Sequence, residues 1–129
     1  MYQVVVEDMF AAAHRLRQYK GKCENLHGHN WKVAVAVEGE TLDKTGILVD
    51  FTILKKELNE ILKVLDHKNL NGIEFFKKKN PTSENISFYI YQKIKVALKE
   101  YPVRVKYVKV WESDKQFAQY SQDTIGEKE

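Results

Sequence analysis

The sequence predicts an α+β domain in which two helices cover one face of a four-stranded antiparallel sheet, in the order strand, strand, helix, helix, strand, strand. Segments near both ends of the chain carry valines and apolar residues at a period of two, which is typical of strands. Two segments in the middle repeat leucine or isoleucine at helical spacing. We expect a single domain over residues 1–121, followed by a flexible tail over 122–129.

The first two strands are predicted from β-branched residues and from parity. Residues 2–13 favour extended backbone because valines follow one another near their start. Counted by twos, Phe10, Ala12 and His14 share one face. Residues 18–25 are polar and form a loop, and residues 27–38 form the second strand. One face of that strand carries His27, His29, Trp31, Val33, Val35 and Val37. A hairpin of the two strands would bring His14 near His29.

The first helix is predicted over residues 53–65, after a turn-rich connection over 39–46. Either Asp50 or Thr52 can cap its N-terminus, because both side chains accept hydrogen bonds from backbone N–H groups. Its apolar stripe consists of Leu54, Leu58, Ile61 and Leu65. Asp66 and His67 follow its end. The run of lysines over 77–79 is predicted to be a solvated loop.

The second helix begins within residues 81–85, where Thr82 or Ser83 can cap it and Glu84 suits the helix dipole. Its buried stripe consists of Ile86, Ile90, Ile94, Ala97 and Leu98. Pro102 stops it. The third strand covers 103–112, where a change of parity indicates either a bulge or burial on both faces, and a weaker fourth strand covers 116–121. Four strands leave two open edges, so we expect oligomerisation through the sheet.

Composition excludes several classes of function. A formal net charge of +3 is too small to predict nucleic-acid binding, and no basic recognition motif is present, but the charge suits an anionic small substrate. The single cysteine rules out an intramolecular disulfide and fits a reducing compartment. No apolar run approaches the ~18 residues of a membrane span, and the N-terminus lacks the basic segment of a signal peptide. We therefore expect a cytoplasmic protein that binds neither nucleic acid nor membrane.

Three of the four histidines form one constellation, which predicts a metal site. His27 and His29 share a strand face, and the hairpin adds His14. Three neutral imidazoles with one open coordination position are typical of a catalytic zinc. Cys23, four residues before His27, has three possible roles: a fourth ligand that closes a structural site, a buried small side chain, or a base whose thiol pKa falls near the cation.

Four other residues are candidates, each with a structural alternative. Asp66 and His67 have the composition of an orienting carboxylate beside a proton carrier, or of a histidine at a helix C-terminus. Glu112 ends a valine-rich strand, where it either faces solvent or accepts two hydrogen bonds from an amidine-like N–H pair of a heterocycle. Thr82 and Glu84 bind a ligand or cap a helix.

Five motifs in order resemble the 6-pyruvoyl-tetrahydropterin synthase / 6-carboxy-tetrahydropterin synthase family, and together they cover nearly the whole chain. They are Phe10-Ala11-Ala12-Ala13-His14, Cys23-x-x-x-His27-Gly28-His29-Asn30, Leu65-Asp66-His67-x-x-Leu70-Asn71, Pro81-Thr82-Ser83-Glu84-Asn85 and Val110-Trp111-Glu112. The resemblance implies the tunnelling fold, in which subunits join their sheets into a barrel, usually as a hexamer of two trimers.

The resemblance also implies a substrate, 7,8-dihydroneopterin triphosphate, and roles for the candidate residues. It implies zinc on His14, His27 and His29. It implies Cys23 as the catalytic base, with Asp66 and His67 completing a proton-transfer triad that is often shared across a subunit interface. It implies that Glu112 anchors the pterin, with Thr82 and Glu84 nearby.

The spacing around Cys23 points to one subfamily. Three residues separate Cys23 from His27, which resembles the 6-carboxy-tetrahydropterin synthases of queuosine and deazapurine biosynthesis. The implied reaction releases triphosphate and acetaldehyde and leaves 6-carboxy-5,6,7,8-tetrahydropterin. Glu24 leaves a second product open, because family members with a glutamate in this loop make 6-hydroxymethyl-dihydropterin for folate synthesis. A 6-pyruvoyl-tetrahydropterin synthase and a non-catalytic, zinc-stabilised pterin-binding oligomer are the remaining alternatives.

Overall fold

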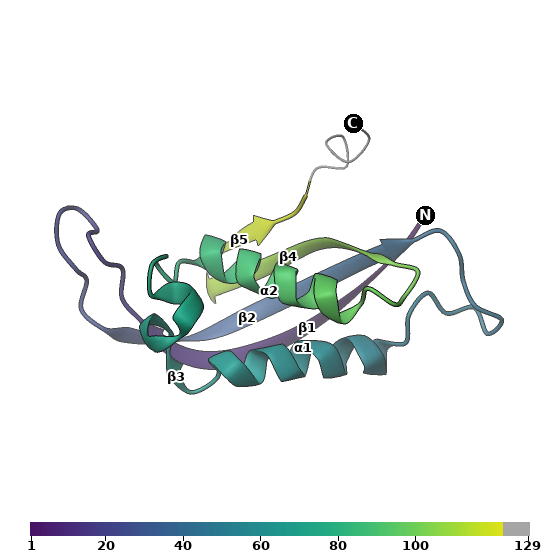
Figure 1. The fold of residues 1–129 in the computed structure, drawn as a ribbon, viewed down its shortest axis with the longest axis horizontal. Helices are drawn as coiled ribbons and strands as arrows, with labels where there is room; N and C mark the ends of the chain where they lie inside the picture. The colour runs from purple at the N-terminus through teal and green to yellow at the C-terminus, as the bar shows by residue number, and fades with distance from the viewer. Residues whose placement is uncertain (123–129) are drawn as a thin grey trace.

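The computed structural model describes residues 1–122 as one five-stranded sheet with two helices packed on the same face (Figure 1). The strands are β1 (Tyr2–His14), β2 (His27–Gly39), β3 (Lys68–Asn69), β4 (Arg104–Ser113) and β5 (Gln116–Tyr120), in the spatial order β3-β1-β2-β4-β5. The helices are α1 (Phe51–Leu65) and α2 (Ser83–Ala97), with the short 3-10 helices η1 (Leu70–Gly72) and η2 (Glu74–Phe76) between them. The predicted α+β class is confirmed. The tail expected over 122–129 lies outside the described residues, apart from Gln122.

The sheet has five strands where four were predicted. The additional strand, β3, pairs in parallel with β1 through Ala12–Lys68 and Ala13–Asn69. Two residues are too few to show the alternation from which a strand is predicted. Because β3 directly follows Asp66 and His67, its pairing with β1 holds these two residues at the edge of β1.

The β1–β2 hairpin is the longest ladder of the sheet, and it runs without a break from Tyr2–Gly39 to His14–His27. Its inward face is buried, with Trp31, Val33, Val35 and Val37 fully inaccessible to solvent. The predicted parity of both strands is therefore confirmed. The indole Nε1 of Trp31 also donates to the carbonyl of Ala12 at 3.1 Å, which ties the two strands together beside the histidines.

Helix α1 covers β1, and its cap follows one of the two predicted choices. Asp50 is the N-cap, because its Oδ1 accepts from the Thr52 N–H at 2.8 Å. Ile61, expected in the apolar stripe, is partly buried and packs against the core, and the stripe also includes the buried Leu62, which was not predicted. The buried stripe consists of Leu54, Leu58, Leu62 and Leu65.

Helix α2 covers β4 and β5, and Thr82 rather than Ser83 is its N-cap. The predicted bulge in the third long strand is confirmed. In the β2–β4 ladder, Ala36 faces Tyr107 and Val37 faces Val105, so Lys106 is the extra residue. A second shift, between Trp111 and Ser113 in the β4–β5 ladder, leaves Glu112 without a pairing partner on β5.

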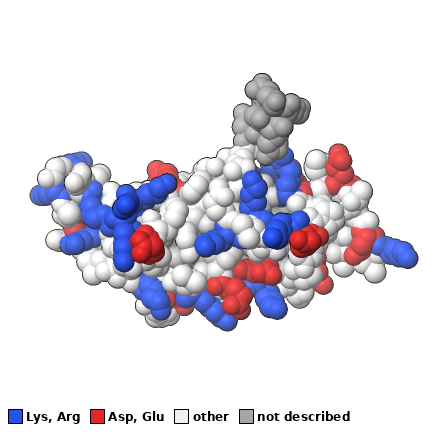
Figure 2. All heavy atoms as spheres, in the orientation of Figure 1, with Lys and Arg blue, Asp and Glu red and all other residues white. Residues whose placement is uncertain are grey.

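Neither long helix in the described part of the chain is long and apolar enough to cross a membrane. Basic side chains gather at the end of the molecule that holds the loop between β1 and β2 and the 3-10 helices (Figure 2). The histidine ends of β1 and β2 lie at this same end (Figure 1).

Replacing Leu58 by alanine tests the packing of α1 on the sheet. Leu58 is fully buried, so Leu58→Ala should lower the free energy of unfolding by about 2–5 kcal/mol. Val64, which lies on the same helix and is 49% exposed, provides the control, and Val64→Ala should change it by less than about 0.5 kcal/mol. Denaturant unfolding followed by circular dichroism measures both, and equal effects would show that the stripe is misassigned.

Candidate metal centre and active site

Three histidine side chains converge at the end of the β1–β2 hairpin. The ladder pairs His14 directly with His27, and the alternation of β2 puts His29 on the same face. The nearest ligand atoms of the three rings all lie within 4.8 Å of one another. The predicted approach of His14 to His29 is therefore confirmed, with ring centroids 5.2 Å apart.

Backbone carbonyls orient two of these rings. His14 Nδ1 donates to the carbonyl of Pro81 at 2.7 Å, and His27 Nδ1 donates to that of Asn25 at 2.9 Å. Each bond selects the tautomer in which Nε2 carries a lone pair, as is usual for a metal-ligating histidine. Sequence reasoning missed these two carbonyls, because every residue carries one and only the folded backbone brings a particular carbonyl to a ring.

The inner nitrogens of the cluster fit a metal ion. Nε2 of His14 and Nε2 of His29 are buried and lack a hydrogen-bond partner among the described residues. Buried polar atoms are normally satisfied, and a cation bound by these nitrogens would satisfy both. His14 is buried whereas His27 is exposed, so the site is open on one side, as a catalytic metal requires.

Burial also favours the neutral form of His29 that a metal needs. Desolvation lowers the pKa of His29 below its usual value, and the neighbouring His14 and His27 add to this effect. The carboxylates of Glu112 and Glu24 act in the opposite direction on the same pKa. The net result is an imidazole that stays deprotonated, and able to bind a cation, at a lower pH than a free histidine.

Glu112 lies beside the cluster. Its carboxylate oxygens are 3.5 Å from His14 Nε2 and 3.8 Å from His29 Nε2. It also lines a cavity of about 290 Å³ together with Thr82, Glu84 and Phe117. The fold thus brings together the three residues predicted to bind the pterin. The Thr82 hydroxyl also accepts from the Asn85 N–H at 3.1 Å, so the capping alternative holds for that side chain as well.

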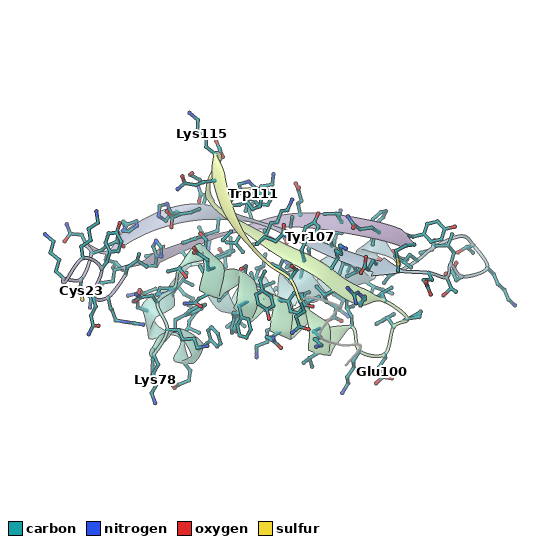
Figure 3. The ribbon with its side chains drawn as sticks, turned by 90° about the horizontal axis from the view of Figure 1, so that it is seen from above. Cys23, Lys78, Glu100, Tyr107, Trp111 and Lys115 are labelled. Atoms are coloured by element: carbon teal, nitrogen blue, oxygen red, sulfur yellow. The ribbon has the colours of Figure 1, made fainter. Side chains whose placement is uncertain are left out.

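Cys23 and Glu24 lie in the loop between β1 and β2. Cys23 is exposed and occupies one end of the molecule (Figure 3). In the part of the chain that the structure describes, the cluster of potential metal ligands comprises the three histidines without Cys23. Glu24 is half-buried, and its Oε1 accepts from the Leu16 N–H at 3.0 Å.

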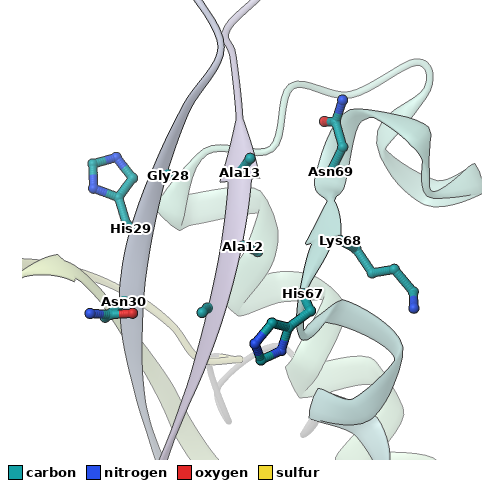
Figure 4. A pocket seen from close by; sticks show the side chains of 9 residues that line it. Ala12, Ala13, Gly28, His29, Asn30, His67, Lys68 and Asn69 are labelled. Atoms are coloured by element: carbon teal, nitrogen blue, oxygen red, sulfur yellow. The ribbon is translucent and has the colours of Figure 1, made fainter.

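The side chains of Asp66 and His67 lie together at the edge of β1, with 3.0 Å between Asp66 Oδ2 and His67 Nδ1. The Ala11 N–H donates to Asp66 Oδ1 at 2.9 Å, and this bond is the main cause of the lowered pKa of Asp66. The His67 side chain is 81% exposed and lines an open cavity of about 500 Å³. In Figure 4, β1 runs between His67 and His29, and both residues line this same cavity.

The charge of Glu112 should be visible in the titration of His29. In the metal-free protein, NMR should give a His29 midpoint below about 6.5, the value of an unperturbed histidine. Glu112→Gln should lower that midpoint further, because it removes the carboxylate that raises the pKa. A midpoint that rises in the variant would contradict the arrangement of charges described above.

Known sequences of pterin-forming enzymes are similar to this chain over most of its length. Residues 3–123 match the family described as 6-pyruvoyl tetrahydropterin synthase. The chain is 38% identical over 112 residues to dihydroneopterin monophosphate aldolase of Pyrococcus furiosus, covering 87% of this chain and 90% of that one. It is also 38% identical over 105 residues to 6-carboxy-5,6,7,8-tetrahydropterin synthase of Synechocystis, covering 75% and 78%.

Solved structures of proteins named 6-pyruvoyl tetrahydropterin synthase have the same fold as this chain. The 6-pyruvoyl tetrahydropterin synthase of Caenorhabditis elegans superposes with a TM-score of 0.81 at 36% identity, over 95% of this chain and 98% of that one. A Plasmodium vivax 6-pyruvoyltetrahydropterin synthase, described as a mutant in which a catalytic glutamate is replaced by alanine, gives 0.76 at 26% identity over the same shares. The five-stranded α+β architecture is thus the tunnelling fold, and the chain belongs to the 6-pyruvoyl tetrahydropterin synthase family of pterin-forming enzymes.

Proposed function

We propose that the protein is a zinc-dependent 6-carboxy-5,6,7,8-tetrahydropterin synthase of queuosine and 7-deazapurine biosynthesis. It would act on 7,8-dihydroneopterin triphosphate, with loss of triphosphate and acetaldehyde. The observation that carries the metal dependence is the cluster of His14, His27 and His29, with two buried Nε2 atoms facing inward. The choice of product rests on the three residues between Cys23 and His27 and on the relative from Synechocystis that is named for this product.

The binding side of the site would consist of the cavity beside the cluster. Zinc on the three histidines would supply Lewis-acid polarisation of an oxygen on the substrate side chain. The Glu112 carboxylate has two oxygens available for the N–H pair of a pterin, which is the bidentate geometry that favours planar heterocycles. Thr82 and Glu84 line the same cavity and would border the ring.

Proton transfer would fall to Cys23 with Asp66 and His67. A thiol near a cation loses its proton more readily, which suits Cys23 as a base. Asp66 holds one ring nitrogen of His67 at 3.0 Å, and the rest of that ring is exposed. Because the His67 side chain is 81% exposed at the edge of β1, we propose that it serves the site of a neighbouring subunit.

Two features support an oligomer and an anionic substrate. β3 pairs with β1 only at Ala12 and Ala13, so the edge of β1 over residues 2–11 has no strand beside it in the described chain. Such an edge suits pairing with β5 of another subunit, within a hexamer of two trimers. The basic end of the molecule, next to the histidines, suits a triphosphate (Figure 2).

A second candidate is an enzyme that makes 6-hydroxymethyl-dihydropterin for folate synthesis. Glu24 directly follows Cys23, and its carboxylate is close enough to the cluster to raise the pKa of His29. The Pyrococcus relative is named as an aldolase, and the Plasmodium structure is described with a catalytic glutamate. Glu24 would then be the base in place of Cys23.

Product analysis tests the proposal. The zinc-loaded protein is incubated with 7,8-dihydroneopterin triphosphate, and the pterins are separated by liquid chromatography with mass detection. We expect 6-carboxy-tetrahydropterin and acetaldehyde, and loss of turnover in Cys23→Ala. A 6-hydroxymethyl product, or full turnover by Cys23→Ala, would overturn the assignment.

A further inference from the structure

The three residues that follow the ligand His14 are held by an unusual set of bonds. Arg15, Leu16 and Arg17 lie beyond the end of β1, yet each has both its backbone N–H and its carbonyl hydrogen-bonded. Five of these six bonds involve a side chain from elsewhere in the chain. We call residues 15–17 the clasped segment.

Two asparagines hold the outer residues of the clasped segment. Asn71 Oδ1 accepts from the Arg15 N–H and Asn71 Nδ2 donates to the Arg15 carbonyl, both at 2.9 Å. Asn80 makes the same pair of bonds to Arg17, at 2.9 Å and 3.0 Å. An amide side chain carries a donor and an acceptor, so it can replace a neighbouring strand at one residue.

Both asparagines are themselves fixed next to other parts of the site. The Asn71 N–H donates to Asn69 Oδ1 at 3.1 Å, at the end of β3 that follows His67. The Asn80 carbonyl accepts from Asn85 Nδ2 at 2.9 Å, and Asn80 precedes Pro81, whose carbonyl orients His14. The clasped segment therefore joins the turn of His67 to the ligand His14.

Glu24 holds the middle residue. Its Oε1 accepts from the Leu16 N–H at 3.0 Å, and its own N–H donates to the Leu16 carbonyl at 2.9 Å. The chain returns to make these bonds through a tight turn, where Lys20 and Gly21 have φ values of +52° and +83°. Glu24 thus closes the loop that carries Cys23, the residue next to it.

We infer that Glu24, Asn71 and Asn80 are positioning residues, which clasp residues 15–17 and thereby fix His14 and Cys23 for the reaction. This inference rests on the proposed function for its activity readout. It assigns Glu24 a role as hydrogen-bond acceptor, whereas the second candidate function assigns it a role as base. One oxygen of the carboxylate is already engaged by a backbone donor, which supports the first role.

Two substitutions of Glu24 separate these roles. Glu24→Gln keeps an acceptor for the Leu16 N–H, so kcat should stay within about threefold of the wild-type value. Glu24→Ala removes the acceptor, and kcat should fall by about 10-fold to 100-fold with little change in KM, the range found when a group that orients a site is lost. Glu100→Ala, at the opposite end of the molecule from Cys23 (Figure 3), is the matched control and should keep wild-type turnover.

Hydrogen exchange at Leu16 gives a readout that is independent of turnover. In Glu24→Ala the Leu16 amide should exchange at least about fivefold faster, and in Glu24→Gln it should stay protected. Equal losses of kcat in both variants, with the amide still protected in Glu24→Gln, would identify Glu24 as a base and overturn the inference. An unchanged exchange rate in Glu24→Ala would overturn it even if the wild-type protein had a different substrate.

Asn80→Asp extends the test to the other clasps. Aspartate keeps the shape of the side chain but offers no donor to the Arg17 carbonyl. The variant should bind zinc about 10-fold to 100-fold more weakly, because the segment next to His14 is released. Zinc affinity measured by competition with a chelator checks this, and wild-type affinity would contradict a role for Asn80 in holding His14.

Discussion

The register of the β1–β2 hairpin is the constraint on which the rest of the structure depends. It pairs His14 with His27 and puts His29 on the same face, and it places buried Trp31 against the rings of His14 and His29. A slip by one residue would turn one strand's histidines to the opposite face, because strand side chains alternate. The long apolar face of the hairpin, which packs under the helices, makes such a slip costly. The core of the domain therefore fixes the geometry of the site.

The site gathers groups from segments that are distant in sequence. The strands bring three imidazoles together, the bulge at the end of β4 adds the Glu112 carboxylate, and the turn before α2 adds the Pro81 carbonyl. These contributions meet at the basic end of the molecule (Figure 2), whose positive charge would suit the anionic substrate proposed above. Asp66 and His67 lie at the edge of β1, just before β3, and the His67 side chain is largely exposed. The described chain thus holds a cluster of three potential metal ligands and, at the edge of β1, the pair of Asp66 and His67, whose proposed role is proton transfer.

The sequence predicted most of this arrangement because its main patterns are local or periodic. The parity of the strands, the helix caps and the histidine spacing are all visible in the order of residues, and so is the bulge in β4. The two-residue strand β3 has no period from which it could be predicted, and helical spacing alone did not show that Leu62 lies deeper in the core than its neighbour Ile61. Hydrogen bonds such as those of Asn71 to Arg15 and of Asn80 to Arg17 form only where distant segments meet in the fold. The order of residues therefore does not show which backbone groups these asparagines bind.

The most direct test of the account is the identity of the atoms that bind the metal. X-ray absorption at the zinc edge, on the full chain loaded with one zinc per protomer, distinguishes nitrogen and oxygen neighbours from sulfur. An open centre held by His14, His27 and His29 predicts nitrogen and oxygen alone, with zinc–nitrogen distances of about 2.0–2.1 Å. A zinc–sulfur distance of about 2.3 Å would show that Cys23 closes the site, and it would contradict both the catalytic metal and the role of Cys23 as a base.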